Sequence, residues 1–377
     1  MEAYLDNSAT TKVCEKSIDA MVKCMRESWG NPSSLHMAGI SADEVLQQAR
    51  EEIAKSLSCN KKEISFTSGG TESNNLAILG TARRRKTKTA KKVITSTIEH
   101  ASVEAAFDEL EKEGFEVVRL SPDENGKISL SDLEKEIDEN TILVSIMAVN
   151  NEIGSIQPFD KIKSVIKRKN SPALLHVDAV QAFGKIILKP KSIGIDLMTV
   201  SSHKIHGPKG TGALFIDEKA KISPIIFGGE QENKLRPGTE AVPAIAGFCA
   251  AVKELANINA ELKKMTTLRD DFLLKLNGMQ GVFINSPADA SPYIVNISLD
   301  GLRSETVLNF LSNMGIYVSS GSACAKGHKS HVLKALGLSD NRVDSAIRIS
   351  FSRETTEDEL DFFIQGIEKA QKMLRRR

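Results

Sequence analysis

Short apolar segments alternate with helix-like stretches over much of the chain, and this alternation restricts the possible folds more than any other feature. The predicted helices include Ser41–Leu57, Leu130–Ile137 and Phe159–Lys169. The predicted strands are Lys92–Ser96, Glu116–Leu120, Ile142–Ala148, Leu174–Val177, Leu197–Val200 and Gly212–Ile216. Strands of this length that alternate with helices are typical of a mainly parallel sheet with helices on both faces. The sequence therefore predicts an α/β fold.

The pattern changes after about Val242, where a long helix is followed by a few short strands and further helices. This order is typical of a smaller α+β domain. A chain of 377 residues is long enough to form two domains. We expect a large domain at residues 12–242 and a small domain made of residues 1–11 and 243–377.

Composition restricts the class of protein further. The 50 basic and 49 acidic residues nearly balance, so nothing indicates general nucleic-acid binding. No apolar run approaches the roughly 20 residues that a membrane-spanning helix needs. The five cysteines are scattered, with no paired or metal-like spacing and no signal peptide before them. A set of this kind predicts a reducing compartment, and we expect a cytoplasmic protein.

Two chemically distinctive residues follow successive buried strands. Lys204 comes shortly after the apolar run Ile193–Val200, which reads as a strand, and Asp178 follows Leu174–Val177. A buried lysine has a lowered pKa, so its neutral amine can attack a carbonyl and form a Schiff base. An aspartate at this end of a parallel strand faces a ligand crevice, where it could pair with the pyridinium nitrogen of pyridoxal phosphate. Alone, the lysine would indicate a surface turn and the aspartate a helix N-cap.

Other residues fit the same ligand, although each is a weak signal alone. Gln181 could form a hydrogen bond with the ring hydroxyl of the cofactor. Gly69 and Gly70 precede a helix predicted to open at Thr71, where backbone amides and the helix dipole could hold a small phosphate group. His100 follows another strand and could stack on the ring and move protons near neutral pH.

Taken together, these segments resemble the cysteine desulfurases, a family of fold-type I pyridoxal-phosphate enzymes that transfer sulfur from L-cysteine to acceptors. The resemblance extends from Tyr4 to Phe351, nearly the whole chain. The matching motifs are Tyr4–Thr11, Gly30–Ser34, Thr67–Ser73, Val149–Gly154, His176–Asp178, Ser202–Lys204, Arg236–Thr239 and Ser319–Cys324. The family's architecture implies a sheet of the seven-stranded type in the large domain.

The resemblance also implies a role for each matching position. Lys204 would hold the cofactor as a Schiff base, Asp178 would pair with its ring nitrogen, and His100 would stack over the ring. Gln181 would contact the ring hydroxyl. The phosphate ligands would be Gly70, Thr71, Ser201, His203 and, from the neighbouring subunit of a homodimer, Thr239. The substrate carboxylate would be clamped by Arg348, with help from Asn151 and Asn31.

Cys324 would be the nucleophile that takes sulfur from L-cysteine as a persulfide, while L-alanine is released. Two lysines and two histidines follow it within seven residues, and these neighbours favour the thiolate. Gly321 and Gly327 on either side predict a loop free to move, as is needed for a thiol that attacks inside a pocket and delivers outside it.

Two departures from the family leave the sulfur acceptor open. Only seven residues separate Cys324 from Val332, fewer than in the best-known housekeeping members with this motif. The sequence also ends at Arg377, without the tail by which those members engage an iron–sulfur scaffold. The expected acceptor is therefore either a tRNA-thiolation enzyme or an iron–sulfur scaffold protein.

Other functions remain as alternatives. A selenocysteine lyase or a cysteine lyase would share nearly every motif, and a non-catalytic, partner-binding relative would be a protein of another class. The basic run Arg83–Lys92, with seven cations in ten residues, is interpreted as a solvated helix C-terminus. Docking of tRNA or of an acidic partner is the alternative for this run.

Overall fold

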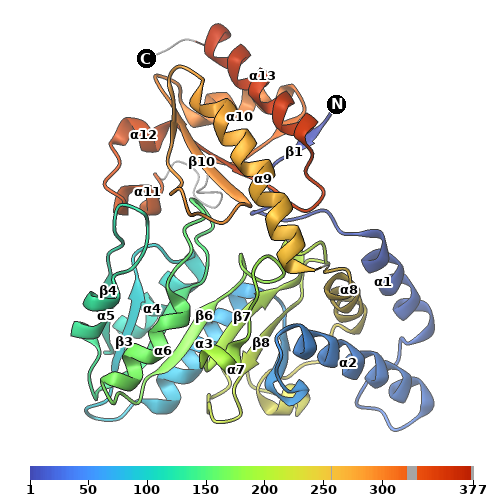
Figure 1. Cartoon of the computed structure of the whole chain (residues 1–377). Coiled ribbons are helices and arrows are strands. Elements are labelled where there is room, and N and C mark those ends of the chain that lie inside the picture. The colour runs from blue at the N-terminus through green and yellow to red at the C-terminus, as the bar shows by residue number, and fades with distance from the viewer. Residues whose placement is uncertain (256, 321–328, 375–377) are drawn as a thin grey trace.

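A seven-stranded sheet forms the centre of the computed structural model, which describes residues 1–255, 257–320 and 329–374 (Figure 1). In spatial order its strands are β2 (Ile64–Thr67), β8 (Gly212–Ile216), β7 (Leu197–Ser201), β6 (Leu174–Asp178), β5 (Thr141–Met147), β3 (Lys92–Ser96) and β4 (Glu116–Leu120). Neighbours from β7 to β4 pair in parallel, whereas β8 is antiparallel to both β7 and β2. The predicted mainly parallel sheet of an α/β fold is confirmed.

Both faces of this sheet are buried, because adjacent residues of a strand belong to different apolar cores. In β3, Val93 packs in one core and Ile94 in another. Leu197 and Met198 of β7 divide in the same way. Successive side chains of a strand point to opposite faces, so a nearly continuous apolar run requires cover on both sides.

Helices separate and follow the strands. Those that precede β8 along the chain are α1 (Glu15–Glu27), α2 (Met37–Ser56), α3 (Gly70–Arg85), α4 (Ala101–Lys112), α5 (Leu130–Glu136), α6 (Phe159–Arg168) and α7 (Pro190–Ile193). The later helices are α8 (Val242–Lys253), α9 (Ile258–Asn277), α10 (Ser304–Asn313), α11 (His331–Ala335), α12 (Asp340–Asp344) and α13 (Glu357–Met373). Within the described ranges, no helix has the length and apolar character needed to span a bilayer.

Two smaller sheets lie together in the upper part of Figure 1. One places β10 (Ile294–Leu299) between β9 (Val282–Ile284) and β12 (Ala346–Ser350), all antiparallel. In the other, β1 (Ala3–Tyr4) pairs in parallel with β11 (Ile316–Tyr317). The first residues of the chain therefore lie against its carboxyl-terminal part, while α8 contacts α1 and α2. The division between residues 242 and 243 stays a prediction.

One predicted strand begins later than the sequence indicates. The apolar run Ile193–Val200 is not continuous strand, because Ile193 is the last residue of α7. Gly194 ends this helix with a φ of +85°, a conformation that glycine adopts without a steric penalty, and β7 starts only at Leu197. Apolar periodicity over so short a stretch does not separate a last helical turn from the start of a strand.

The basic run Arg83–Lys92 is largely engaged with the fold. Arg83 pairs with Glu113 at 2.5 Å, as expected for a cation in the last turn of α3. Lys92 is buried in β3, and its Nζ lies 3.3–3.6 Å from carboxylate oxygens of Glu116, Glu136 and Asp138. The exposed cations at the end of α3 agree with the expected solvated helix C-terminus, whereas Lys92 departs from it because it is buried and ion-paired in β3.

Candidate active site

The carboxyl ends of the central strands meet around one cavity of about 240 Å³. Nine of the predicted site residues line it: Gly70, Thr71, His100, Asn151, Asp178, Gln181, Ser201, His203 and Lys204. They lie at or just after the ends of β2, β3, β5, β6 and β7, and the common direction of these strands brings their ends to the same edge of the sheet. The sheet topology thus gathers residues that are as much as 134 positions apart, from position 70 to position 204.

Lys204 lies in the short 3-10 turn η2 (Ser202–Lys204), directly after β7. Its Nζ donates hydrogen bonds to the carbonyl oxygens of Ser8 and, at 2.7 Å, of Ala9. Burial lowers the pKa of Lys204 to about 7, and the positive charges of Lys185 and Arg348 act in the same direction. A large fraction of the amine is therefore uncharged near neutral pH, which a nucleophilic or basic lysine requires.

Asp178 is the last residue of β6 and is 6% exposed. One carboxylate oxygen accepts a hydrogen bond from Nδ2 of Asn74 at 2.7 Å, and the other accepts from the backbone N–H of Val180 at 3.0 Å. Asn74 is a site residue that sequence reasoning missed, although it directly follows the Thr67–Ser73 motif. Its donor holds the Asp178 carboxylate in place.

His100 is the N-cap of α4 and faces the same cavity. Its Nδ1 accepts the backbone N–H of Ser102 at 3.2 Å and also bonds the Ser102 hydroxyl at 2.8 Å. Burial lowers the pKa of His100, so the neutral ring prevails, and an accepting Nδ1 places its proton on Nε2. Because Asn74 also donates to the Ser102 hydroxyl at 2.9 Å, one network connects His100 with Asp178.

The turn between β2 and α3 forms the proposed anion site. Gly69 has a φ of +150°, and Gly70 is the first residue of the 16-residue helix α3. A Cβ on Gly70 would lie 2.8 Å from a methyl group of Val180, so only glycine fits there without a shift. The Ser201 hydroxyl, which also lines the cavity, is buried and has no hydrogen-bond partner in the described structure. A ligand oxygen would satisfy this hydroxyl.

Arg348 reaches this region from β12 and is 2% exposed. Its Nη2 donates to Asp6 at 2.8 Å, and its Nη1 donates to the carbonyl oxygen of Asn151 at 2.9 Å. Asn151 lines the cavity and Arg348 does not, so the guanidinium lies behind Asn151 as seen from the cavity. Within the described residues, the Nε of Arg348 is buried and has no hydrogen-bond partner.

Besides Arg348, three predicted site residues are not placed at this cavity. Asn31 is exposed and uses its side-chain oxygen to accept the backbone N–H of Ser33 at 2.9 Å. Thr239 is also exposed and does not line the cavity. Cys324, the predicted nucleophile, lies outside the described residues.

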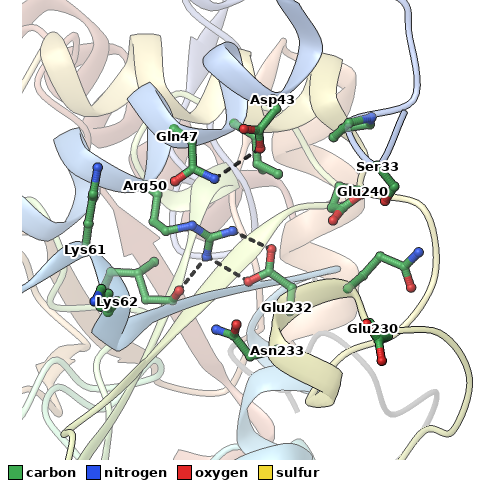
Figure 2. Close-up of a pocket in the computed structure, with 14 residues that line it drawn as sticks. Ser33, Asp43, Gln47, Arg50, Lys61, Lys62, Glu230, Glu232, Asn233 and Glu240 are labelled. Carbon is green, nitrogen blue, oxygen red and sulfur yellow. Dashed lines mark hydrogen bonds and ion pairs between the residues drawn. The ribbon is translucent and has the colours of Figure 1, made fainter. Parts of the chain in front are cut away.

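The segment that carries Thr239 is fixed to its own subunit by two ion pairs. Figure 2 shows the first pair, in which the Arg50 guanidinium donates two hydrogen bonds of 2.7 Å to the Glu232 carboxylate. The second joins Arg236 to Glu72 in the first turn of α3, at 2.8 Å. Both ion pairs lie close to the glycine turn. Glu72 stands two residues after Gly70. The Glu232 carboxylate also accepts a hydrogen bond from the backbone N–H of Phe66 in β2 at 3.0 Å.

Glu99, beside His100, is another residue that sequence reasoning missed. It is fully buried, and one oxygen accepts hydrogen bonds from the Ser96 hydroxyl at 2.6 Å and from the Met147 N–H at 3.1 Å. Burial raises the pKa of Glu99 to about 8, so the carboxyl is mostly protonated at neutral pH. Glu99 stands among polar residues in the sequence, between Ile98 and His100, so no local pattern shows that its side chain is buried.

The fold and this site together define the class of protein. The chain belongs to the aminotransferase class-V family, whose model matches residues 3–363. It is 42% identical over 373 residues to the NifS/IcsS protein homolog of Lactobacillus delbrueckii subsp. bulgaricus, covering 97% of this chain and 96% of the relative. It is 39% identical over 379 residues to the cysteine desulfurase IscS of Dictyoglomus turgidum, covering 99% of this chain and 95% of that one.

A solved structure of a relative has the same fold. A NifS-like protein matches with a TM-score of 0.94 and 39% identity, over 99% of this chain and 100% of the other. The predicted family and fold class are therefore confirmed.

Proposed function

We propose that this chain is a pyridoxal-phosphate-dependent cysteine desulfurase that converts L-cysteine to L-alanine and retains the sulfur as a persulfide on Cys324. The observation that carries the proposal is the meeting of Lys204 and Asp178 at one cavity, with a lysine pKa lowered to about 7. Relatives named cysteine desulfurase, aligned over nearly the whole chain, support the substrate and reaction.

The cavity offers a partner for each group of the cofactor. Asp178 is fixed by its hydrogen bonds and would pair with the ring nitrogen. Gln181 would face the ring hydroxyl, and His100 would cover the ring. The phosphate would bind at the glycine turn and form a hydrogen bond with the Ser201 hydroxyl, which has no partner in the described structure. The phosphate ligands would be Gly70, Thr71, Ser201 and His203. Thr239 of a second subunit would complete this set.

When bound, pyridoxal phosphate supplies an electron sink that weakens bonds at the substrate's α-carbon. Lys204, freed as a neutral amine, would take the α-proton of L-cysteine. Arg348 would bind the substrate carboxylate with its planar fork, with help from Asn151 at the cavity wall and from Asn31. The Cys324 thiolate would then attack the substrate sulfur, so that the carbon–sulfur bond breaks and the sulfur stays on Cys324. The remaining three-carbon product takes up protons and leaves as L-alanine.

The proposal includes a homodimer that shares its sites. Strongly exposed apolar side chains support this assembly, since Leu35 is 96% exposed and Phe227 84%. The segments that carry Leu35 and Phe227 are neighbours in space. Pro32, near Leu35, and Glu230, near Phe227, line the same pocket, which is drawn in Figure 2. A second subunit would cover these side chains and bring Thr239 to the partner's phosphate site.

The division into a large domain at residues 12–242 and a small domain of residues 1–11 and 243–377 belongs to this proposal, as does a cytoplasmic location. The sulfur acceptor would be a tRNA-thiolation enzyme or an iron–sulfur scaffold protein. Incubation of the persulfide form with each acceptor, followed by measurement of transferred sulfur, would separate the two.

Mass spectrometry of the holoenzyme after incubation with L-cysteine tests the reaction. We expect one added sulfur on the peptide that contains Cys324, together with L-alanine, and neither product in the Lys204→Ala variant. L-Alanine without a Cys324 persulfide would indicate a lyase that does not use this thiol. Turnover of selenocysteine only would indicate a selenocysteine lyase, and absence of any product would favour the non-catalytic alternative.

A further inference from the structure

A second buried lysine lies beside Lys204 and is not used by the mechanism above. Lys185 is 6% exposed, and in the described part of the chain no carboxylate forms an ion pair with it. Its Nζ donates to Oε1 of Gln181 at 3.4 Å and lies 5.3 Å from the ring centroid of Tyr293. Burial of an unpaired ammonium is costly, so a lysine retained in this position needs an explanation.

A short chain of hydrogen bonds connects the two lysines. Lys185 donates to the side-chain oxygen of Gln181, whose Nε2 donates to the carbonyl oxygen of Ser8 at 2.9 Å. The same carbonyl accepts from Lys204. Since an ammonium group can only donate, Lys185 fixes the orientation of the Gln181 amide, with its oxygen toward Lys185 and its NH₂ toward Ser8. The second N–H of that amide remains for a cofactor hydroxyl.

Among the charged groups around Lys204, Lys185 has the clearest effect on its pKa. The charged groups that act on Lys204 are Lys185, Arg348, Asp6 and Asp178. Arg348 and Asp6 form an ion pair at 2.8 Å, so their effects largely cancel. Asp178 would be matched by the cofactor's ring nitrogen. Among the described residues, Lys185 forms no ion pair with a carboxylate, although Glu261 lines the same small cavity.

Lys185 and Lys204 share a small cavity with other charged and aromatic side chains. Lys185, Lys204, Glu261 and Tyr293 line a small cavity of about 40 Å³, which His206 and Arg353 also reach. Burial lowers the pKa of Lys185 to about 8, and Arg348 adds to this effect. Within this shared space the positive charge of Lys185 lowers the pKa of Lys204.

We propose that Lys185 is a positioning residue that keeps the Lys204 amine uncharged near neutral pH and holds Gln181 with its NH₂ toward the cofactor hydroxyl. Lys185 does not line the proposed cofactor cavity, and it would act through its charge and through Gln181. The inference rests on the proposed role of Lys204 as the lysine that holds the cofactor.

The test measures the protonation of Lys204 directly. Folded, cofactor-free protein is treated briefly with an acylating reagent over a range of pH, and labelling of the Lys204 peptide is quantified by mass spectrometry. In Lys185→Met, which keeps most of the apolar stem but not the charge, we expect the labelling midpoint to rise by about one pH unit. Labelling should then fall roughly tenfold at pH values below both midpoints.

Three further variants make the result specific. Lys185→Arg keeps the charge and should keep the midpoint of the natural protein. Lys185→Gln removes the charge with a smaller polar side chain and should repeat the shift, which covers the case that Lys185→Met does not fold. The matched control Lys169→Met removes an exposed lysine at the end of α6 and should leave the midpoint unchanged.

A pH titration of the holoenzyme absorbance gives an independent readout, because the cofactor's spectrum follows the protonation of its bond with Lys204. Its midpoint should rise in Lys185→Met and Lys185→Gln and stay in place in Lys185→Arg. An unchanged midpoint in both neutral variants, or an equal shift in Lys185→Arg, would overturn the proposal. Neither measurement needs turnover of L-cysteine, so failure of the proposed function would be seen separately.

Discussion

Single buried groups decide much of the chemistry at the residue scale. Asp178, His100 and Asn74 belong to one hydrogen-bonded network, which is joined through the Ser102 hydroxyl. Such a network fixes the position of the Asp178 carboxylate and the orientation of the His100 ring, because buried hydrogen bonds restrain both side chains. The preorganised site therefore depends on side chains that have no role in catalysis themselves.

Glu99 provides a prediction at this scale, with a sign that follows from its pKa. The folded protein raises the pKa of Glu99 to about 8 from an ordinary value of 4.5, so its contribution to stability is full below pH 4.5 and is lost as the pH rises toward 8. Glutamine cannot ionise. We therefore expect Glu99→Gln to gain stability over the natural protein as the pH rises through this window, by a few degrees in Tm at pH 8.5.

Thermal unfolding at pH 5.5 and at pH 8.5 measures this difference. The exposed Glu139→Gln variant serves as the control and should show no such change between the two pH values. A Glu99→Gln effect that is equal at both would contradict protonation of Glu99 in the fold.

Close approach between backbones matters at the scale of elements. Gly212 starts β8 and lies between β2 and β7, pairing with Thr67 on one side and Ser201 on the other. A Cβ there would lie 2.8 Å from both the Gly69 Cα and the Val200 carbonyl oxygen. These are backbone atoms, which cannot rotate away as the end of a side chain can.

We expect Gly212→Ala to lower the free energy of unfolding by about 1–3 kcal/mol, since it overpacks a close contact. It should also weaken retention of the cofactor, because the displaced turn is the proposed phosphate site. Chemical denaturation and the cofactor content of the purified protein measure the two effects. Gly278→Ala is the matched control, with no neighbouring atom closer than 3.5 Å, and should be nearly neutral. Equal stability of both variants would show that the turn can move aside.

The Arg50–Glu232 ion pair stabilises the conformation of the segment that leads to Thr239. Three successive residues of this segment, from Glu232 to Lys234, have positive φ between 46° and 67° although none is glycine. Each such residue costs of the order of 1 kcal/mol or more, so the conformation needs support from its surroundings. The buried pair with Arg50 and the contact with the Phe66 N–H provide this support. The turn thereby directs the chain toward the exposed Thr239.

The exposed apolar side chains are a property of the whole molecule. Leu35 and Phe227 would lose contact with water only in an assembly, and burial of such a side chain contributes about 1.5–3 kcal/mol. We expect the double variant Leu35→Asp/Phe227→Asp to be a folded monomer that retains cofactor poorly, because Thr239 of a partner would be missing from its site. Sedimentation velocity and circular dichroism measure assembly and fold.

Leu274→Asp is the control for this experiment, since Leu274 is 72% exposed on α9 and should tolerate the change. A natural protein that sediments as a monomer, or a double variant that remains a dimer, would contradict the proposed assembly.

The sequence by itself determined the sheet and the edge at which the site forms. Strand and helix periodicity are local, so the runs that end near Asp178 and Lys204 could be recognised and their common edge predicted from parallel topology. Motif order was sufficient to name the family. Only the tertiary structure decided which side chains meet: Arg348 with Asp6, 342 residues away, Asn74 with Asp178, and Lys185 with Gln181. Hydrogen bonds and burial depend on distances between distant segments, and no local pattern records those distances.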